Sequence, residues 1–162
     1  MAVTPGDLAP EFSLPGVEDG VRREYSLVAH RGRPVVLVFY PGDNTPICTR
    51  QLNAYSADLE QFTELDAQVL AISPQDLDSH EDFAADQGGF GFPLLADVDK
   101  AVAEAYGVLG PLGFYRRSVF VVDEDGRLTY VHRGHAASTF RSSPELTAAV
   151  RSGRRRPATG NG

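Results

Sequence analysis

Cys48, which follows Thr45 by three residues, is the residue of this sequence that could support thiol chemistry. Cys48 is the one cysteine among 162 residues, so an internal disulfide and a cysteine-rich zinc or iron–sulfur site are excluded. A lone cysteine is often a small buried hydrophobic residue. In its thiolate form it is instead a nucleophile that can be oxidised and recycled. The surrounding sequence has to decide between these two interpretations.

The position of Cys48 favours the reactive form. It lies three residues after Thr45, where a helix is expected to begin, and the unpaired N–H groups of a first helical turn stabilise an anion. A free thiol titrates near about 8.5, and a shift to about 6 requires roughly 3.4 kcal/mol, of which a helix terminus supplies about 0.3–2 kcal/mol. We therefore expect a cation beside the sulfur.

The elements that must position Cys48 are a strand and a helix. The run 34–40 (PVVLVFY) is almost continuously apolar and β-branched, as expected of a strand buried on both faces. It ends at the turn-forming residues 41–44 (PGDN). Thr45 is expected to cap the next helix with Pro46 in its first position, and apolar residues at helical spacing continue that helix to about Leu65.

The rest of the chain alternates between strands and helices. An N-terminal hairpin is expected around a turn at residues 15–20. Further strands are predicted at 68–72, 93–95, 118–122 and 128–132, and further helices near 79–87, 100–106 and 144–151. This order predicts an α/β fold with a mixed central β-sheet flanked by helices. We expect one domain over residues 1–152 and a disordered tail over 153–162, which holds an arginine cluster.

The charge and the N-terminal sequence exclude some partners. The net charge is −7, with 15 basic and 22 acidic residues, so a nucleic-acid partner is not expected. The amino terminus lacks a basic start and a signal-length apolar run, and no stretch approaches the roughly 20 apolar residues of a membrane span. We therefore expect a cytoplasmic protein that does not bind a membrane.

The segment 39–49 (FYPGDNTPICT) resembles the active-site stretch of peroxiredoxins, in which Pro, Thr or Ser, and Cys stand at the spacing of Pro41, Thr45 and Cys48. It is most similar to the Q-type, or bacterioferritin-comigratory-protein-like, subgroup. The similarity extends from residues 6–12 through 73–74 and 92–97 to 117–123. It implies a thioredoxin-like fold with an N-terminal β-hairpin extension, and reduction of hydrogen peroxide or organic hydroperoxides without metal, flavin or haem.

The resemblance also implies a role for each matching residue. Cys48 would be the peroxidatic cysteine, the hydroxyl of Thr45 would bind the peroxide, and Pro41 would shield the thiolate. Arg117 matches the catalytic arginine, and its neighbour Arg116 would point to the opposite face of the strand. Tyr40 and Ile47 are implied as further substrate-binding residues.

These roles fit the chemistry of thiol peroxidation. Lowering a thiol pKa increases the thiolate fraction but weakens the nucleophile, and the two effects nearly cancel. Any large acceleration must therefore come from donors that orient the peroxide and stabilise its leaving oxygen.

Two positions depart from the family pattern. Asn53 stands where many Q-type members have a resolving cysteine, and Gln51 stands where a glutamate is common. The implied cycle is of the 1-Cys kind: Cys48 becomes a sulfenic acid, and an external thiol reduces it. That reductant could be thioredoxin, a glutaredoxin-like protein or a low-molecular-weight thiol. The protein could be a monomer or a homodimer.

Two other functions stay open. A thiol-disulfide oxidoreductase is disfavoured because no Cys-x-x-Cys pair is present. A redox sensor or binding module could use oxidised Cys48 to signal to a protein partner. His132 and His135 have a spacing that occurs in metal sites, but no third ligand is evident, so we expect surface or loop histidines.

Overall fold

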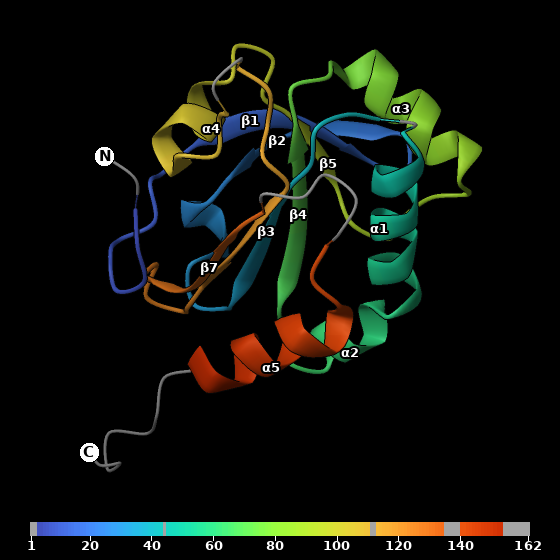
Figure 1. Ribbon diagram of the computed structural model, residues 1–162. Coiled ribbons are helices and arrows are strands. Elements are labelled where there is room, and N and C mark those ends of the chain that lie inside the picture. The colour runs from blue at the N-terminus through green and yellow to red at the C-terminus, as the bar shows by residue number, and fades with distance from the viewer. Residues whose placement is uncertain (1–2, 44, 111–112, 135–139, 154–162) are drawn as a thin grey trace.

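A computed structural model describes residues 3–43, 45–110, 113–134 and 140–153. Seven strands form one sheet in the order β2-β1-β5-β4-β3-β6-β7 (Figure 1). In chain order the strands are β1 Ser13–Glu18, β2 Val21–Ser26, β3 Val35–Phe39, β4 Gln68–Ser73, β5 Leu94–Ala96, β6 Ser118–Val122 and β7 Leu128–Arg133. The mixed α/β sheet that the sequence predicts is therefore present.

The strand that precedes Cys48 lies in the middle of this sheet. β3 pairs in parallel with β4 and antiparallel with β6, and all five of its residues are buried. Both of its faces are covered, which explains why the sequence of this strand is a continuous apolar run rather than an alternation. The strand ends where Tyr40 and Pro41 begin the connection to α1.

Helices cover both faces of the sheet. Four of them, α1 Pro46–Ala57, α2 Leu59–Thr63, α3 Leu77–Asp86 and α5 Ser143–Gly153, contribute to one core together with β3, β4 and β6. The second core is built from the other face of those strands, α4 Ala101–Tyr106 and an N-terminal segment that ends at Leu27. The 3-10 turn η1 Val28–His30 follows and contributes no buried residue. In Figure 1, α1 and α2 stand to the right of the sheet and α4 stands at the upper left.

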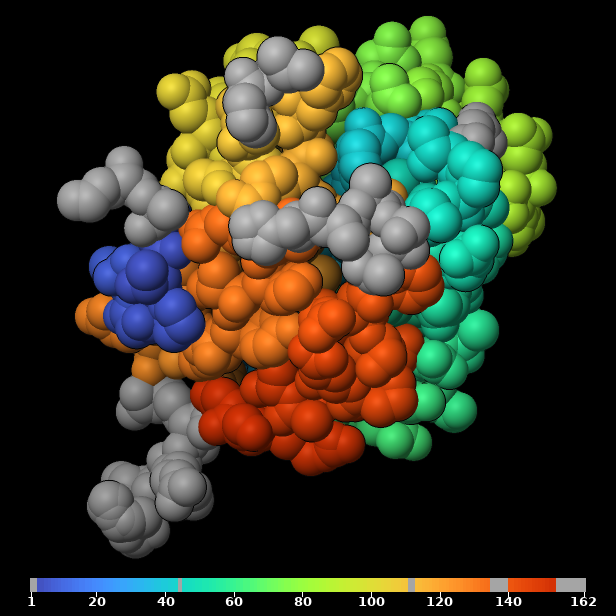
Figure 2. Space-filling view, in the orientation of Figure 1, coloured from blue at the N-terminus to red at the C-terminus, as the bar shows by residue number. Residues whose placement is uncertain are grey.

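The space-filling view in Figure 2 shows one side of the molecule. There β7, in orange, lies beside α5, in red, and α1 follows along the right-hand edge. α5 thus covers the sheet next to the edge strand β7.

The N-terminal hairpin is present, but its turn is shorter than the sequence indicated. Only Asp19 and Gly20 lie between β1 and β2, and both have a positive φ, while Pro15, Gly16 and Glu18 belong to β1. β1 also pairs antiparallel with β5, so the hairpin continues the sheet rather than standing apart from it. β5 pairs only with Gly16 and Val17, so Pro15 lies where β1 has β2 as its one neighbouring strand, as at a sheet edge, where proline is tolerated.

The helix after β3 differs from the expectation in two ways. It ends at Ala57, and a new short helix starts at Leu59, because Asp58 leaves the helical region at φ −99° and ψ 15°. Thr45 occupies the predicted N-cap position in extended backbone, with Pro46 as the first helical residue, although its side chain makes no capping hydrogen bond. The hydroxyl donates instead to the carbonyl oxygen of Gly42 at 3.2 Å.

The C-terminal helix is longer than predicted. α5 runs to Gly153, so this residue belongs to the folded part of the chain and not to a tail that starts there. The remainder of the expected tail, 154–162, lies outside the described residues. Within the described part of the chain, no helix is long and apolar enough to cross a membrane.

Candidate active site

Cys48 is the third residue of α1 and is completely buried. The first turn of this helix contains no acidic side chain, so nothing there opposes a negative charge on the sulfur. The thiol belongs to the core that also holds Tyr40, Leu52 and Tyr55. A buried thiolate needs a charged donor as its partner.

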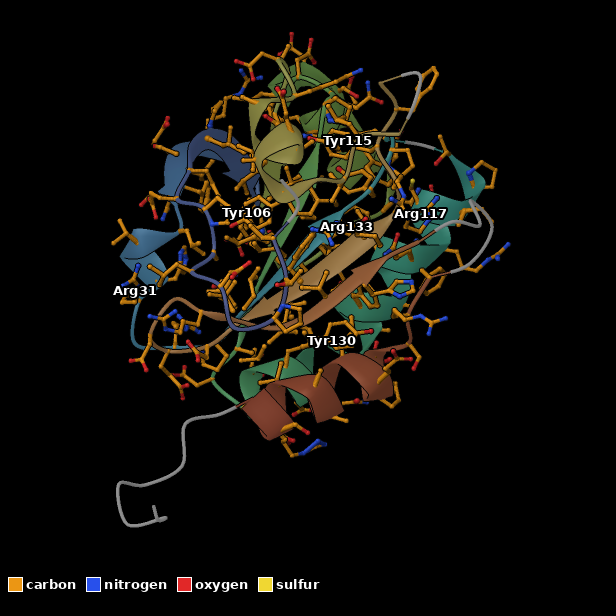
Figure 3. All side chains as sticks on the ribbon, turned by 60° about the vertical axis from the view of Figure 1, so that its left-hand side comes forward. Arg31, Tyr106, Tyr115, Arg117, Tyr130 and Arg133 are labelled. Carbon is orange, nitrogen blue, oxygen red and sulfur yellow. The ribbon has the colours of Figure 1, made fainter. Side chains whose placement is uncertain are left out.

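Arg117 supplies that donor. Its Nη1 lies 3.2 Å from Cys48 Sγ, and the arginine is only 7% exposed. The contact joins residues 69 positions apart, and the register of the sheet explains it. Ser118 pairs with Phe39, so the residue before β6 comes alongside the end of β3, from which the chain enters α1. Figure 3 shows Arg117 beside the start of α1.

Arg116 is directed elsewhere. Its Nε donates to the carbonyl oxygen of Gly134 at 3.2 Å, and its Nη2 lies 3.4 Å from the carbonyl oxygen of Arg133. Successive side chains of an extended segment point to opposite sides, which separates the two neighbouring arginines. Of these two residues, only Arg117 contacts the thiol in the described contacts.

Gln51 holds the guanidinium from the other side. Its Oε1 accepts a hydrogen bond from Arg117 Nη1 at 2.7 Å, and its Nε2 donates to Tyr55 Oη at 3.3 Å. Tyr55 in turn donates to the carbonyl oxygen of Arg141 at 2.6 Å. Burial raises the pKa of Tyr55 to about 12, against a smaller lowering effect of its hydrogen bond with Gln51, so its hydroxyl keeps the proton that it donates.

From the sequence, Gln51 was noted only as a departure from the family pattern, and Tyr55 was not identified. Both follow Cys48 on one face of α1, three and seven residues later. That spacing was the available signal. No sequence signal could have identified the partner of Tyr55, which is a carbonyl oxygen 86 residues away.

The other residues implied by the resemblance lie around the start of α1. Thr45 is exposed, and Pro41 and Ile47 are half-buried. Tyr40 is fully buried and its hydroxyl donates to Asp43 Oδ1 at 2.7 Å, so this hydroxyl already has a partner inside the protein. The structure thus brings Cys48 and Arg117 into contact and leaves the hydroxyl of Thr45 near the surface.

Comparison with known proteins identifies the family. Residues 5–131 match the AhpC/TSA family. The chain belongs to this peroxiredoxin family. It is 38% identical over 151 residues to a Mycobacterium tuberculosis protein named as a peroxiredoxin. The aligned region covers 86% of this chain and 94% of that protein. It is also 37% identical over 132 residues to the chloroplastic Peroxiredoxin Q of Oryza sativa subsp. japonica, covering 80% of this chain and 59% of the relative.

Solved peroxiredoxin structures share the fold. The reduced 2-Cys peroxiredoxin of Plasmodium vivax superposes with a TM-score of 0.84 at 25% identity, over 93% of this chain and 96% of that one. AhpC of Mycobacterium bovis gives a TM-score of 0.85 at 24% identity, over 94% and 93% of the two chains. The thioredoxin-like fold is therefore confirmed, and the protein is a thiol peroxidase, an oxidoreductase.

A buried carboxylate, that of Asp97, positions the segment that leads to Arg117. Asp97 accepts hydrogen bonds from the backbone N–H groups of Val102 and Ala103, at the start of α4, and from the hydroxyl of Tyr115 at 2.5 Å. Tyr115 stands two residues before Arg117, and Figure 3 shows both residues on the same segment. The burial of Asp97 therefore fixes the approach of the chain to β6.

Other candidate features lie away from this peroxiredoxin thiol. A cavity of about 610 Å³ is lined by the turn between β1 and β2, by α3 and by residues 88–92, and it touches neither Cys48 nor Arg117. Within the described residues, no group of three or more His, Cys, Asp or Glu side chains could hold a metal ion. His132 lies on β7, and His135 falls outside the described residues.

Proposed function

We propose that this protein is a 1-Cys peroxidase in which the Cys48 thiolate reduces hydrogen peroxide or organic hydroperoxides and an external thiol restores it. The contact between Arg117 Nη1 and Cys48 Sγ at 3.2 Å carries this proposal. A guanidinium at hydrogen-bond distance favours the thiolate, and the helix terminus adds to its effect. Both groups lie in a site largely closed to water, where charge interactions are strong.

The first half-reaction transfers one oxygen atom. The thiolate attacks the terminal oxygen of the hydroperoxide, so an S–O bond forms while the O–O bond breaks. The leaving oxygen departs as hydroxide or alkoxide and becomes water or an alcohol on taking up a proton. Cys48 is oxidised to a sulfenic acid, and the peroxide is reduced by two electrons. Thr45 and the guanidinium of Arg117 are the groups we assign to orienting the peroxide.

The second half-reaction needs two thiol equivalents from outside the chain. One thiol condenses with the sulfenic acid to give a mixed disulfide and water, and a second thiol releases Cys48 as a thiol and forms the donor's disulfide. No other cysteine exists in the sequence to replace the first donor. Asn53 stands at the position of a Q-type resolving cysteine and donates to Gln87 Oε1 at 2.8 Å. We place this cycle in the cytoplasm, whose thiol pool would supply the reductant.

The test is oxidation of the reduced protein with one equivalent of peroxide while donor thiols are withheld. We expect a species one oxygen atom heavier that a sulfenic-acid reagent traps, little disulfide-linked dimer on nonreducing gels, and sulfinic acid on further peroxide. A panel of thioredoxin, glutaredoxin and small thiols then identifies the reductant through turnover. A mainly covalent dimer after one equivalent would overturn external resolution.

Cys48→Ser is the matched control. Serine is nearly isosteric but does not ionise near neutrality, so the variant should fold and lose peroxide consumption. Residual turnover above a few per cent would count against Cys48 as the nucleophile. A stopped-flow rate separates an enzyme from a redox sensor, because slow consumption together with slow recycling would favour the sensor.

A further inference from the structure

A second set of buried polar residues lies on the other side of the loop that leads to Cys48. Asp43, in the connection between β3 and α1, has a side chain that is 1% exposed, and His80 on α3 is fully buried. The two are in direct contact, with His80 Nδ1 at 2.7 Å from Asp43 Oδ2. The sequence analysis assigned a role to neither residue. Burial of an ionisable pair inside a small protein is costly unless each group is satisfied.

Every polar atom of this pair has a partner. Asp43 Oδ1 accepts from the Tyr40 hydroxyl at 2.7 Å, and Oδ2 also accepts from the Ser79 hydroxyl at 2.7 Å. The backbone N–H of Asp43 donates to Gln75 Oε1 at 3.0 Å. The loop is therefore held to the start of α3 by side-chain and backbone contacts.

The hydrogen bonds define the charge of the pair. His80 Nε2 lies 2.9 Å from the carbonyl oxygen of Leu95, which can only accept, so Nε2 carries a proton. Nδ1 faces an oxygen of Asp43 that already accepts from a hydroxyl, while the other oxygen accepts from Tyr40. Two hydroxyls already donate to this carboxylate, so it acts as the acceptor, and the proton between Nδ1 and Oδ2 belongs to Nδ1. The pair is an imidazolium and a carboxylate with no net charge.

Tyr40, which donates to Asp43 Oδ1 at 2.7 Å, connects the pair to the core that holds the thiol. Tyr40 lies in the same buried core as Cys48, and after burial the largest effects that raise the pKa of its hydroxyl come from Asp43, followed by the charge of Cys48. A carboxylate so placed would by itself oppose ionisation of the nearby sulfur, as like charges in a shared site do. The imidazolium removes that opposition while the carboxylate continues to hold the loop.

We propose that His80 is a positioning residue that neutralises Asp43, so that the loop bearing Pro41 and Thr45 is anchored by a buried carboxylate without repelling the Cys48 thiolate. The proposal deepens the proposed peroxidase function and rests on Cys48 being its reactive thiol. It assigns to His80 no contact with substrate. Its effect reaches the sulfur through Asp43.

The experiment compares His80→Gln, Asp43→Asn and the double variant. Because Cys48 is the sole cysteine, its ionisation can be followed by thiolate absorbance in the ultraviolet and by alkylation rate against pH. His80→Gln should move the titration midpoint up by about half to one pH unit, with a roughly 3–10-fold loss of peroxide rate at neutral pH. Asp43→Asn should not raise the midpoint, and the double variant should match Asp43→Asn. His30→Gln, on η1, is the matched control and should behave as wild type.

A purely structural role gives a different pattern. Loosening of the loop would shift the titration midpoint in the same direction in both single variants, and the midpoint of the double variant would be shifted at least as far. That result would overturn the proposal. If His80→Gln does not fold, a folded double variant supports charge neutralisation, whereas an equally unfolded one refutes it. The titration reads the thiol directly, so it decides the role of His80 even if Cys48→Ser shows that the peroxidase proposal fails.

Discussion

Arg117 Nη1 donates to Gln51 Oε1 at 2.7 Å and lies 3.2 Å from Cys48 Sγ, so a neutral amide holds the cation that faces the thiol. A glutamate at position 51 would hold the guanidinium equally well but would cancel part of its charge. Gln51 therefore provides geometry without electrostatic competition. This relationship makes the amide a sensitive place to test the site.

Gln51→Glu should raise the midpoint of the thiolate titration and lower the second-order rate with hydrogen peroxide by roughly 3–10-fold at neutral pH, because the new carboxylate adds a like charge near the sulfur. Stopped-flow kinetics and the pH dependence of alkylation measure the two effects. Gln61→Glu on α2, an exposed position, is the matched control. An unchanged or faster reaction in Gln51→Glu would show that the charge of Arg117 is not limiting.

Thr45→Val should reduce the second-order rate by roughly 10–1000-fold, which is the range for losing one donor to a developing charge. This hydroxyl donates to the carbonyl oxygen of Gly42, and it can turn to a peroxide because Thr45 is exposed. Thr49→Val removes a hydroxyl one turn later, which donates to the carbonyl oxygen of Thr45, and should cost much less. Equal losses in the two variants would assign the effect to packing of the helix start.

Arg117→Lys should also slow peroxide reduction, although the positive charge remains. One guanidinium nitrogen, Nη1, makes the contacts with the sulfur and with Gln51 Oε1. A lysine has no second nitrogen in a fixed plane that could orient the peroxide at the same time. Arg116→Lys is the neighbouring control, and its contacts are with carbonyl oxygens of residues 133 and 134. Rate constants for both variants check the assignment, and a slower Arg116→Lys beside a normal Arg117→Lys would reverse it.

The stability of the protein should fall at alkaline pH, and Tyr55 should contribute to the fall. Its folded pKa of about 12 exceeds the value of about 10 of an unfolded tyrosine, so between these values the unfolded chain loses its proton first and unfolding is favoured. A difference of two pKa units between the folded and unfolded protein corresponds to about 2.7 kcal/mol in the free energy of unfolding. In Tyr55→Phe, denaturant unfolding should give a smaller decrease across this range. Parallel stability curves for the two proteins would contradict the contribution.

At neutral pH the same variant should lose stability by about 0.5–1.5 kcal/mol, because it removes the hydrogen bond to the carbonyl oxygen of Arg141. Gln51 Nε2 would also lose the Tyr55 hydroxyl as its acceptor. Arg117, which Gln51 holds through Oε1, would then be less restrained, and peroxide reduction should slow modestly. Activity that is unchanged while stability falls would separate the anchoring of Arg141 from the positioning of Arg117.

Local patterns in the sequence predicted most elements of the fold. The apolar run of β3 predicted a strand covered on both faces, and the residues from Thr45 onward predicted a helix with Cys48 in its first turn; both are present. The patterns failed where local signals compete. The break at Asp58 divides the expected helix, and a turn of only Asp19 and Gly20 leaves Pro15 and Gly16 inside β1. Pairing with β2 and β5 outweighs the turn preference of these residues.

The sequence by itself determined the reactive element of this protein: one cysteine, its place after a buried strand, and its spacing from Pro41 and Thr45 are properties of neighbouring residues. Only the tertiary structure decided what surrounds the sulfur. Arg117 reaches Cys48 because Ser118 pairs with Phe39, and Asp43 meets His80 because α3 packs beside the loop after β3. Such contacts depend on strand register and helix packing across tens of residues, which no local pattern specifies.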